Sequence, residues 1–155
     1  AAPEDAVARV WQREAEPRLR ALADAGAGAS SNWDAMLADK AREYLADGPP
    51  GFVDDGHDFV ASRRTEIRVT EPGEGTIRLG GCEAGFVYRD ARPGGRTVGQ
   101  PPRTGTREIA LEGHAWRHGD GEIDAADRAL IEAEMACAMA DCGFEVRVAE
   151  PGSLA

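Results

Sequence analysis

The stretch RRTEIRVTEPGEGTIRLGGCEAGFVYRD, residues 63–90, decides the fold class of this chain. Polar and apolar residues alternate over short runs, which is the pattern of strands with one solvent-exposed face. Turn residues at 71–75 and 80–81 separate the runs, and a similar run follows a long loop. These patterns predict antiparallel strands within the region that ends at Trp116, namely at Thr65–Val69, Thr76–Leu79, Cys82–Arg89 and Thr106–Leu111.

Helical patterns lie on both sides of these strands. Apolar residues recur at helical spacing over Ala6–Leu22 and Trp33–Ala46, before the strands, and over Ala125–Asp141, after them. Pro17 should kink or break the first of these helices. This order predicts an α+β fold in which the N-terminal helices pack on a strongly bent antiparallel sheet, with an additional C-terminal helix.

The N-terminal helices have apolar stripes and no other large surface to bury. We therefore expect Trp11, Trp33, Leu37 and Phe59 to pack against the concave face of the sheet.

A chain of 155 residues predicts a single domain with a sizeable core. Within it we expect helices and a bent-sheet cone over residues 6–116, with a C-terminal helix and tail appended over residues 124–148. The alternating residues Phe144–Val148 predict either a short final strand or an extended tail.

The chain has a net charge of −10, so it is a poor candidate for binding nucleic acid or an anionic membrane. The charge is uneven, because residues 61–115 carry +2 and each flank, 1–60 and 116–155, carries −6. We interpret the arginines of the strand region first as sheet-face side chains that pair with acidic helices. The alternative is a site for an anionic partner on the sheet.

Several features predict an extracytoplasmic protein. No apolar run approaches the roughly 20 residues of a membrane span. The sequence begins without methionine or an apolar signal core, as expected of a mature or shortened chain, and a lipid anchor on the unprocessed form is compatible with this. Arginine outnumbers lysine 17 to 1, which indicates a GC-rich, actinobacterial genome.

The residues Asp54, Asp55, His57 and Asp58 invite a metal or acid–base interpretation, although a solvated acidic loop is favoured. If the protein is an enzyme, an ionisable group must lie inside the mouth of the cone. The candidate catalytic residues are then His57, Asp58, Tyr44, Tyr88 and His114.

Residues 118–127 resemble the second half of a calcium-binding loop of the dockerin kind. The first and third ligand positions would be Trp116 and His118, which supply no carboxylate, so we predict no calcium site. Phosphate-binding, dinucleotide-binding and zinc motifs are missing from the sequence, and no cofactor is predicted.

The strand segments Arg63–Thr70, Gly75–Glu83 and Gly85–Asp90, with the later strand ending at Trp116, resemble the nuclear transport factor 2-like superfamily of α+β cones. The version they resemble is common in extracytoplasmic proteins and lipoproteins of actinobacteria. Met139–Phe144 is similar to a Cys-Met-x-x-x-Gly-Phe element of such proteins. The resemblance implies a cone that serves either catalysis or binding, and the C-terminal helix departs from it.

Three functional hypotheses follow. The leading one is an extracytoplasmic, non-enzymatic domain that binds a protein partner or a small ligand. The second is a small isomerase or cyclase that uses one of the candidate residues above. The third is an acidic inhibitor or immunity-type protein that masks a basic partner surface.

The three cysteines predict one disulfide, in an oxidising compartment. We expect Cys82 on the sheet to bond to Cys137 on the closing helix, with Cys142 as the alternative partner. A bond between Cys137 and Cys142 is disfavoured because residues five apart in a regular helix are too distant.

Overall fold

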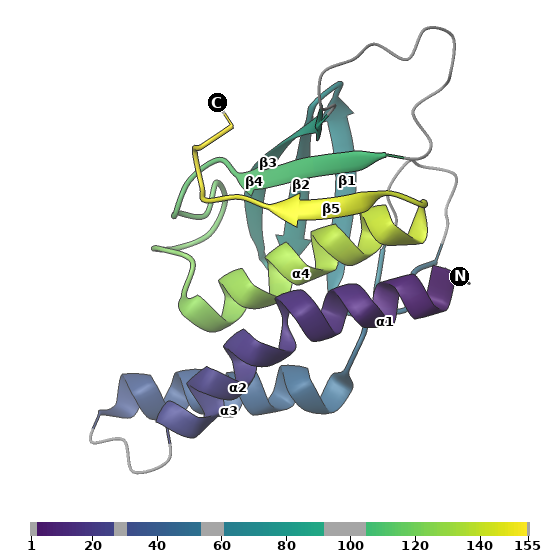
Figure 1. The fold of residues 1–155 in the computed structure, drawn as a ribbon. Coiled ribbons are helices and arrows are strands. Elements are labelled where there is room, and N and C mark those ends of the chain that lie inside the picture. The colour runs from purple at the N-terminus through teal and green to yellow at the C-terminus, as the bar shows by residue number, and fades with distance from the viewer. Residues whose placement is uncertain (1–2, 27–30, 54–60, 92–104, 155) are drawn as a thin grey trace, which may run out of the picture.

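The computed structural model describes residues 3–26, 31–53, 61–91 and 105–154. It confirms the α+β class, with a bent N-terminal helix, two further helices and a five-stranded mixed sheet (Figure 1). In chain order the elements are α1 (Pro3–Glu14), α2 (Glu16–Ala25), α3 (Asn32–Asp47), β1 (Thr65–Glu71), β2 (Glu74–Leu79), β3 (Cys82–Ala91), β4 (Thr106–Leu111), α4 (Ala125–Asp141) and β5 (Glu145–Val148).

Local sequence signals set the helix boundaries. The predicted break near Pro17 is confirmed, because α1 ends at Glu14 and α2 begins at Glu16 with the proline in its first turn. Ser31 caps α3, its side chain accepting a hydrogen bond from the backbone of Asp34. Asp124 caps α4 in the same way, through the backbone of Asp127.

The sheet has the strand order β1-β2-β3-β4-β5, and its first four strands form an antiparallel meander. The short final strand exists, but it runs parallel to β4 as the outermost strand. The sheet is not strongly curled, so the prediction of a strongly bent, wholly antiparallel sheet is wrong. Parallel pairing needs a long crossover, which α4 provides. Because this helix covers the apolar face, the sheet does not have to curl to enclose a core.

Helix α4 is the centre of the core. It lies between the sheet and the N-terminal helices (Figure 1), and thirteen of its residues are buried, from Ala126 to Ala140. It contacts α1, α2, α3 and strands β1, β2, β4 and β5. Small side chains such as Ala129, Ala133 and Ala136 allow neighbours to approach on several sides. The helix expected as an appendage is therefore the element around which the domain packs.

The N-terminal helices pack on α4 and on one another rather than on the sheet, which corrects the predicted arrangement. Trp11 and Leu37 are buried as expected. Trp33, however, lies in the first turn of α3 and is 57% exposed. Phe59 lies outside the described residues.

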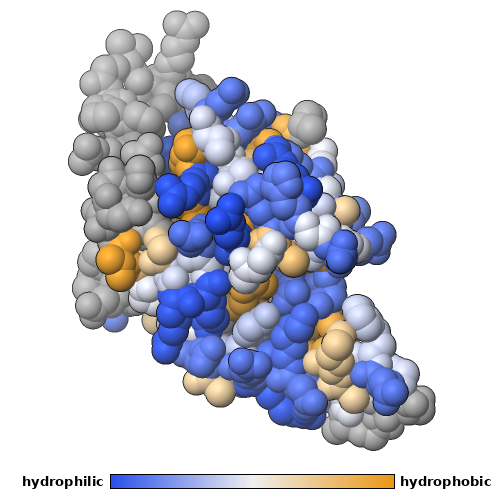
Figure 2. All heavy atoms as spheres, turned by 180° about the vertical axis from the view of Figure 1, so that it is seen from behind, coloured by the Kyte–Doolittle hydropathy of each residue, from blue (hydrophilic) through white to orange (hydrophobic). Residues whose placement is uncertain are grey.

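Of the arginines in the strand region, Arg64 pairs with acidic residues of α3 and α4, as expected, whereas those on the strands pair mainly with glutamates of the same or neighbouring strands. Arg78 lies 3.8 Å from Glu66 and 3.6 Å from Glu83, and Arg89 lies 3.3 Å from Glu108. The reverse side of the molecule is accordingly hydrophilic over most of its area, with separate hydrophobic spots (Figure 2).

None of the three cysteines forms a disulfide, so the structure does not contain the predicted bond from Cys82 to Cys137 or Cys142. The sulfur of Cys137 lies 3.6 Å from the carbonyl oxygen of Val7 and so faces α1. Burial raises the pKa of the Cys137 thiol, with a further contribution from Glu134. Among the described residues, no helix has the length and apolar character needed to cross a membrane.

Candidate functional site

Only three of the five candidate catalytic residues lie in the part of the chain that the structure describes. His57 and Asp58, with Asp54 and Asp55, lie outside the described residues. Tyr44, Tyr88 and His114 are described, and each has a different setting.

Tyr44 takes part in a contact that joins α3 to the first turn of α4. Its hydroxyl donates a 2.7 Å hydrogen bond to Asp127, and Lys40 Nζ lies 2.7 Å from Asp124 and 3.1 Å from Asp127. Burial and the hydrogen bond to Asp127 raise the pKa of Tyr44. Burial lowers the pKa of Lys40, but its two aspartate partners outweigh that effect and raise it. Both groups stay protonated at neutral pH, and the cluster joins α3 to α4 through ion pairs and a hydrogen bond.

This contact uses Asp124 and Asp127, the last two acidic residues of the sequence that resembles a calcium-binding loop. The carboxylates of Asp124 and Asp127 already face the ammonium group of Lys40. No group of three or more histidine, cysteine or acidic residues suited to hold a metal occurs in the part of the chain that the structure describes. The absence of calcium binding stays a prediction.

Tyr88 belongs to a stacked arrangement on β3, β4 and the start of β5. The Arg107 guanidinium lies 4.7 Å from the Tyr88 ring centroid and 3.8 Å from that of Phe144. Arg107 also donates a 3.0 Å hydrogen bond to Asp90. Arg107 on β4 thus contacts an aromatic ring of β3 and the ring of Phe144, just before β5.

His114 is exposed at the edge of a cavity of about 730 Å³ between α2, the loop before α4, and the first turn of α4. Two arginines line that cavity, and both contact Glu132, which is only 1% exposed. Arg18 lies 2.6 Å and Arg128 3.4 Å from the same carboxylate oxygen. Arg128 also lies 3.0 Å from Glu150, so two carboxylates compensate the two positive charges within the protein.

A second buried glutamate, Glu134, ties α4 to the chain before β1. It accepts hydrogen bonds from Ser62 (2.6 Å), from Thr65 (3.0 Å) and from Arg64 Nε (3.0 Å). The Arg64 guanidinium also lies 5.2 Å from the centroid of a ring of Trp11. These contacts join α4 to the segment before β1 and, through Arg64, to α1.

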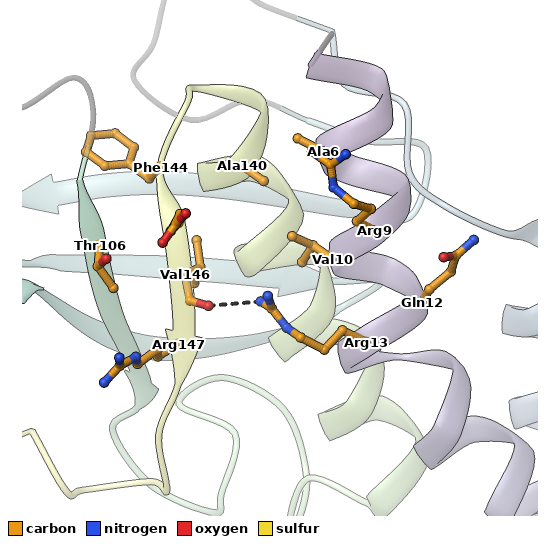
Figure 3. A pocket seen from close by; sticks show the side chains of 11 residues that line it. Ala6, Arg9, Val10, Gln12, Arg13, Thr106, Ala140, Phe144, Val146 and Arg147 are labelled. Carbon is orange, nitrogen blue, oxygen red and sulfur yellow. Dashed lines mark hydrogen bonds between the residues drawn. The ribbon is translucent and has the colours of Figure 1, made fainter. Parts of the chain in front are cut away.

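A groove of about 730 Å³ between α1 and β5 has a different character (Figure 3). Its wall from α1 and its wall from β5 are bridged by one side chain, because Arg13 donates a 2.9 Å hydrogen bond to the carbonyl oxygen of Val146. The apolar lining consists of Ala6, Val10, Ala140, Phe144 and Val146. The polar lining consists of Arg9, Gln12, Arg13, Thr106, Glu145 and Arg147.

The groove has an excess of positive charge in a chain whose net charge is −10. Arg13 pairs with Glu14 at 2.8 Å. Arg9 and Arg147, by contrast, have no ion-pair partner among the described residues. Figure 3 shows Arg9 on the α1 wall, and Arg147 leaving β5 on the side turned away from α1. Uncompensated arginines beside an apolar floor are suited to an anion that also has apolar parts.

Sequence reasoning did not single out these arginines. Arg9 and Arg13 are four residues apart and so share one face of α1, which the sequence could have shown. Arg147 lines the same groove only because the chain crosses over through α4 and β5 pairs parallel to β4, and no local sequence pattern predicts this.

No family model, curated protein or solved structure matches this chain. The resemblance to the nuclear transport factor 2-like superfamily therefore stays a prediction from sequence patterns.

Proposed function

We propose that this chain is a non-enzymatic binding domain that holds an acidic segment of a partner in the groove between α1 and β5. The observation that carries the proposal is the pair of arginines, Arg9 and Arg147, that line the groove without an ion-pair partner among the described residues. Arginine recognises carboxylates well because its planar guanidinium can donate two parallel hydrogen bonds.

The composition of the groove favours binding over catalysis. Its described lining contains no histidine, cysteine or tyrosine, the side chains that most often act as nucleophiles or proton carriers near neutral pH. Its apolar floor, which includes Val10 and Val146, offers contact area to a ligand larger than a simple anion. A location outside the cytoplasm remains part of the proposal on grounds of composition alone.

The test uses a fluorescent peptide of ten residues in which glutamate and valine alternate, with both ends blocked. Fluorescence anisotropy should show binding at low salt that weakens as the ionic strength rises, because exposed charges are screened. The variants Arg9→Gln and Arg147→Gln should each weaken binding about twofold to fivefold, the effect expected for one exposed ion pair.

Arg20→Gln is the matched control, because Arg20 is exposed on α2 and does not line the groove. It removes the same charge and should leave the affinity unchanged. A lysine–valine peptide controls for non-specific association. Equal binding of both peptides, no binding of the acidic one, or equal losses in all three variants would contradict the proposed site.

A further inference from the structure

We infer that the acidic segment binds as an additional β-strand along the outer edge of β5. This inference rests on the proposed function, and it specifies how the partner is held. β5 is the last strand of the sheet, so one side of its backbone has no neighbouring strand. An edge of this kind is a template for pairing with another chain.

Alternate residues of β5 direct their backbone groups to opposite sides. The amide groups of Glu145 and Ala149 donate 2.8 Å hydrogen bonds to the carbonyl oxygens of Gly105 and Ile109, so this set faces β4. Val146 and Val148 therefore face outward. The carbonyl oxygen of Val146 accepts from Arg13, which confirms that direction.

Most of the outward-facing backbone groups of Val146 and Val148 are free to pair with an added strand. The amide of Val146 and both backbone groups of Val148 make no hydrogen bond with any other described residue. The opposite edge of the sheet is less accessible, because Ala61 forms a bridge with Glu66 of β1. The β5 edge is also the one that borders the positively charged groove.

Arg13 occupies one of the positions that an added strand would use. Its guanidinium takes the Val146 carbonyl oxygen that would otherwise accept from the incoming backbone. If the added strand takes over that oxygen, the Arg13 guanidinium is released toward a carboxylate of the same segment. Arg13 thus covers the edge in the unbound protein and becomes a contact in the complex.

The side chains of β5 predict the pattern of the partner. The buried side chain of Val146 points into the core, so the charged side chains of Glu145 and Arg147 lie on the other face. In an added strand, every second side chain would lie on the face of Arg147 and Glu145, where a carboxylate is favoured opposite Arg147 and disfavoured opposite Glu145. The intervening side chains would lie over the apolar floor. The inferred partner is therefore an extended segment in which acidic and apolar residues alternate.

Two N-methylated versions of the glutamate–valine peptide test this inference. One carries N-methyl groups on every glutamate amide and the other on every valine amide, so charge and side chains are unchanged. In an added strand only one of these two sets of amides faces β5. We expect one analogue to bind at least about tenfold more weakly than the parent and more weakly than the other analogue, since each lost backbone hydrogen bond costs about fivefold.

Hydrogen exchange of the protein backbone provides an independent measurement. On binding of the parent peptide, hydrogen exchange at the amides of Val146 and Val148 should slow, while the Arg147 amide, which already faces β4, should change little.

Equal binding of both analogues with no added protection would overturn strand addition. In that case the groove would remain the binding site if Arg9→Gln weakened binding of the parent peptide. If the parent peptide did not bind at all, the proposed function and the inferred strand addition would both be wrong. Self-association through the β5 edge in sedimentation experiments, undisturbed by the peptide, would assign the edge to a second copy and also overturn the inference.

Discussion

Replacing Glu134 by leucine should destabilise the protein by about 4 kcal/mol, because it leaves the buried Arg64 guanidinium with only the more distant and more exposed Asp47 carboxylate, 3.7 Å away. Glu134 is 0% exposed, and the side chain of its partner Arg64 is only 8% exposed. The change also removes the acceptor of the Ser62 and Thr65 hydroxyl groups. For a denaturant dependence of about 2 kcal/mol per molar urea, the unfolding midpoint should fall by about 2 M.

Urea unfolding followed by tryptophan fluorescence is the assay. The double variant Arg64→Met, Glu134→Leu should lose much less stability than the sum of the two single variants, since it leaves no unpaired buried charge. Arg68→Met is the control, because Arg68 is 55% exposed and lies 3.8 Å from Glu66, so its loss should cost less than about 1 kcal/mol. A Glu134→Leu cost below that of the control, or single effects that add in the double variant, would refute the reasoning.

Four smaller predictions concern Gly75, Tyr44, the cysteines and calcium. Gly75→Ala should cost about 2 kcal/mol, because the new Cβ would lie 2.2 Å from the Phe86 ring and 2.6 Å from a backbone oxygen, whereas Gly81→Ala meets nothing within 4 Å and should be near neutral in the same urea assay. The pKa of Tyr44 is raised in the folded state, so stability should fall as the pH rises above about 10, the unfolded value; urea titrations at several pH values should show a shallower fall for Tyr44→Phe, and equal slopes would contradict this. Thiol titration of the unfolded, unreduced protein should detect three thiols, and a count of one would restore the predicted disulfide. Calcium at millimolar concentration should leave the melting temperature unchanged, and a rise of several degrees would show a site at residues 120–127.

Local signals predicted the elements of this fold well. The alternation in residues 65–69 and 76–79 placed strands in the right regions, and Pro17 marked the break between α1 and α2. The arrangement of the elements was missed because it depends on α4. The helix has a broad apolar side, which favours burial, but the resemblance to the cone fold places it outside the core as an appendage. Glu132 and Glu134 are buried against arginines distant in sequence, which no local pattern shows.

The same limit applies to the groove. Arg9 and Arg147 line the same groove only because β5 pairs parallel to β4 after the crossover through α4. Charge counting indicated an anionic partner as one alternative, but it directed attention to the face of the sheet. There the arginines are compensated by glutamates of the same or adjacent strands, such as Glu66 and Glu108.

The most direct test of the proposed function is an NMR titration of the intact chain with the glutamate–valine peptide. We predict that the largest backbone shift changes fall on α1 around Arg9 and Arg13 and on β5 at Val146 and Val148, and that they saturate with the anisotropy curve. Changes concentrated at the cavity beside His114, or spread evenly over the surface, would contradict a binding groove between α1 and β5.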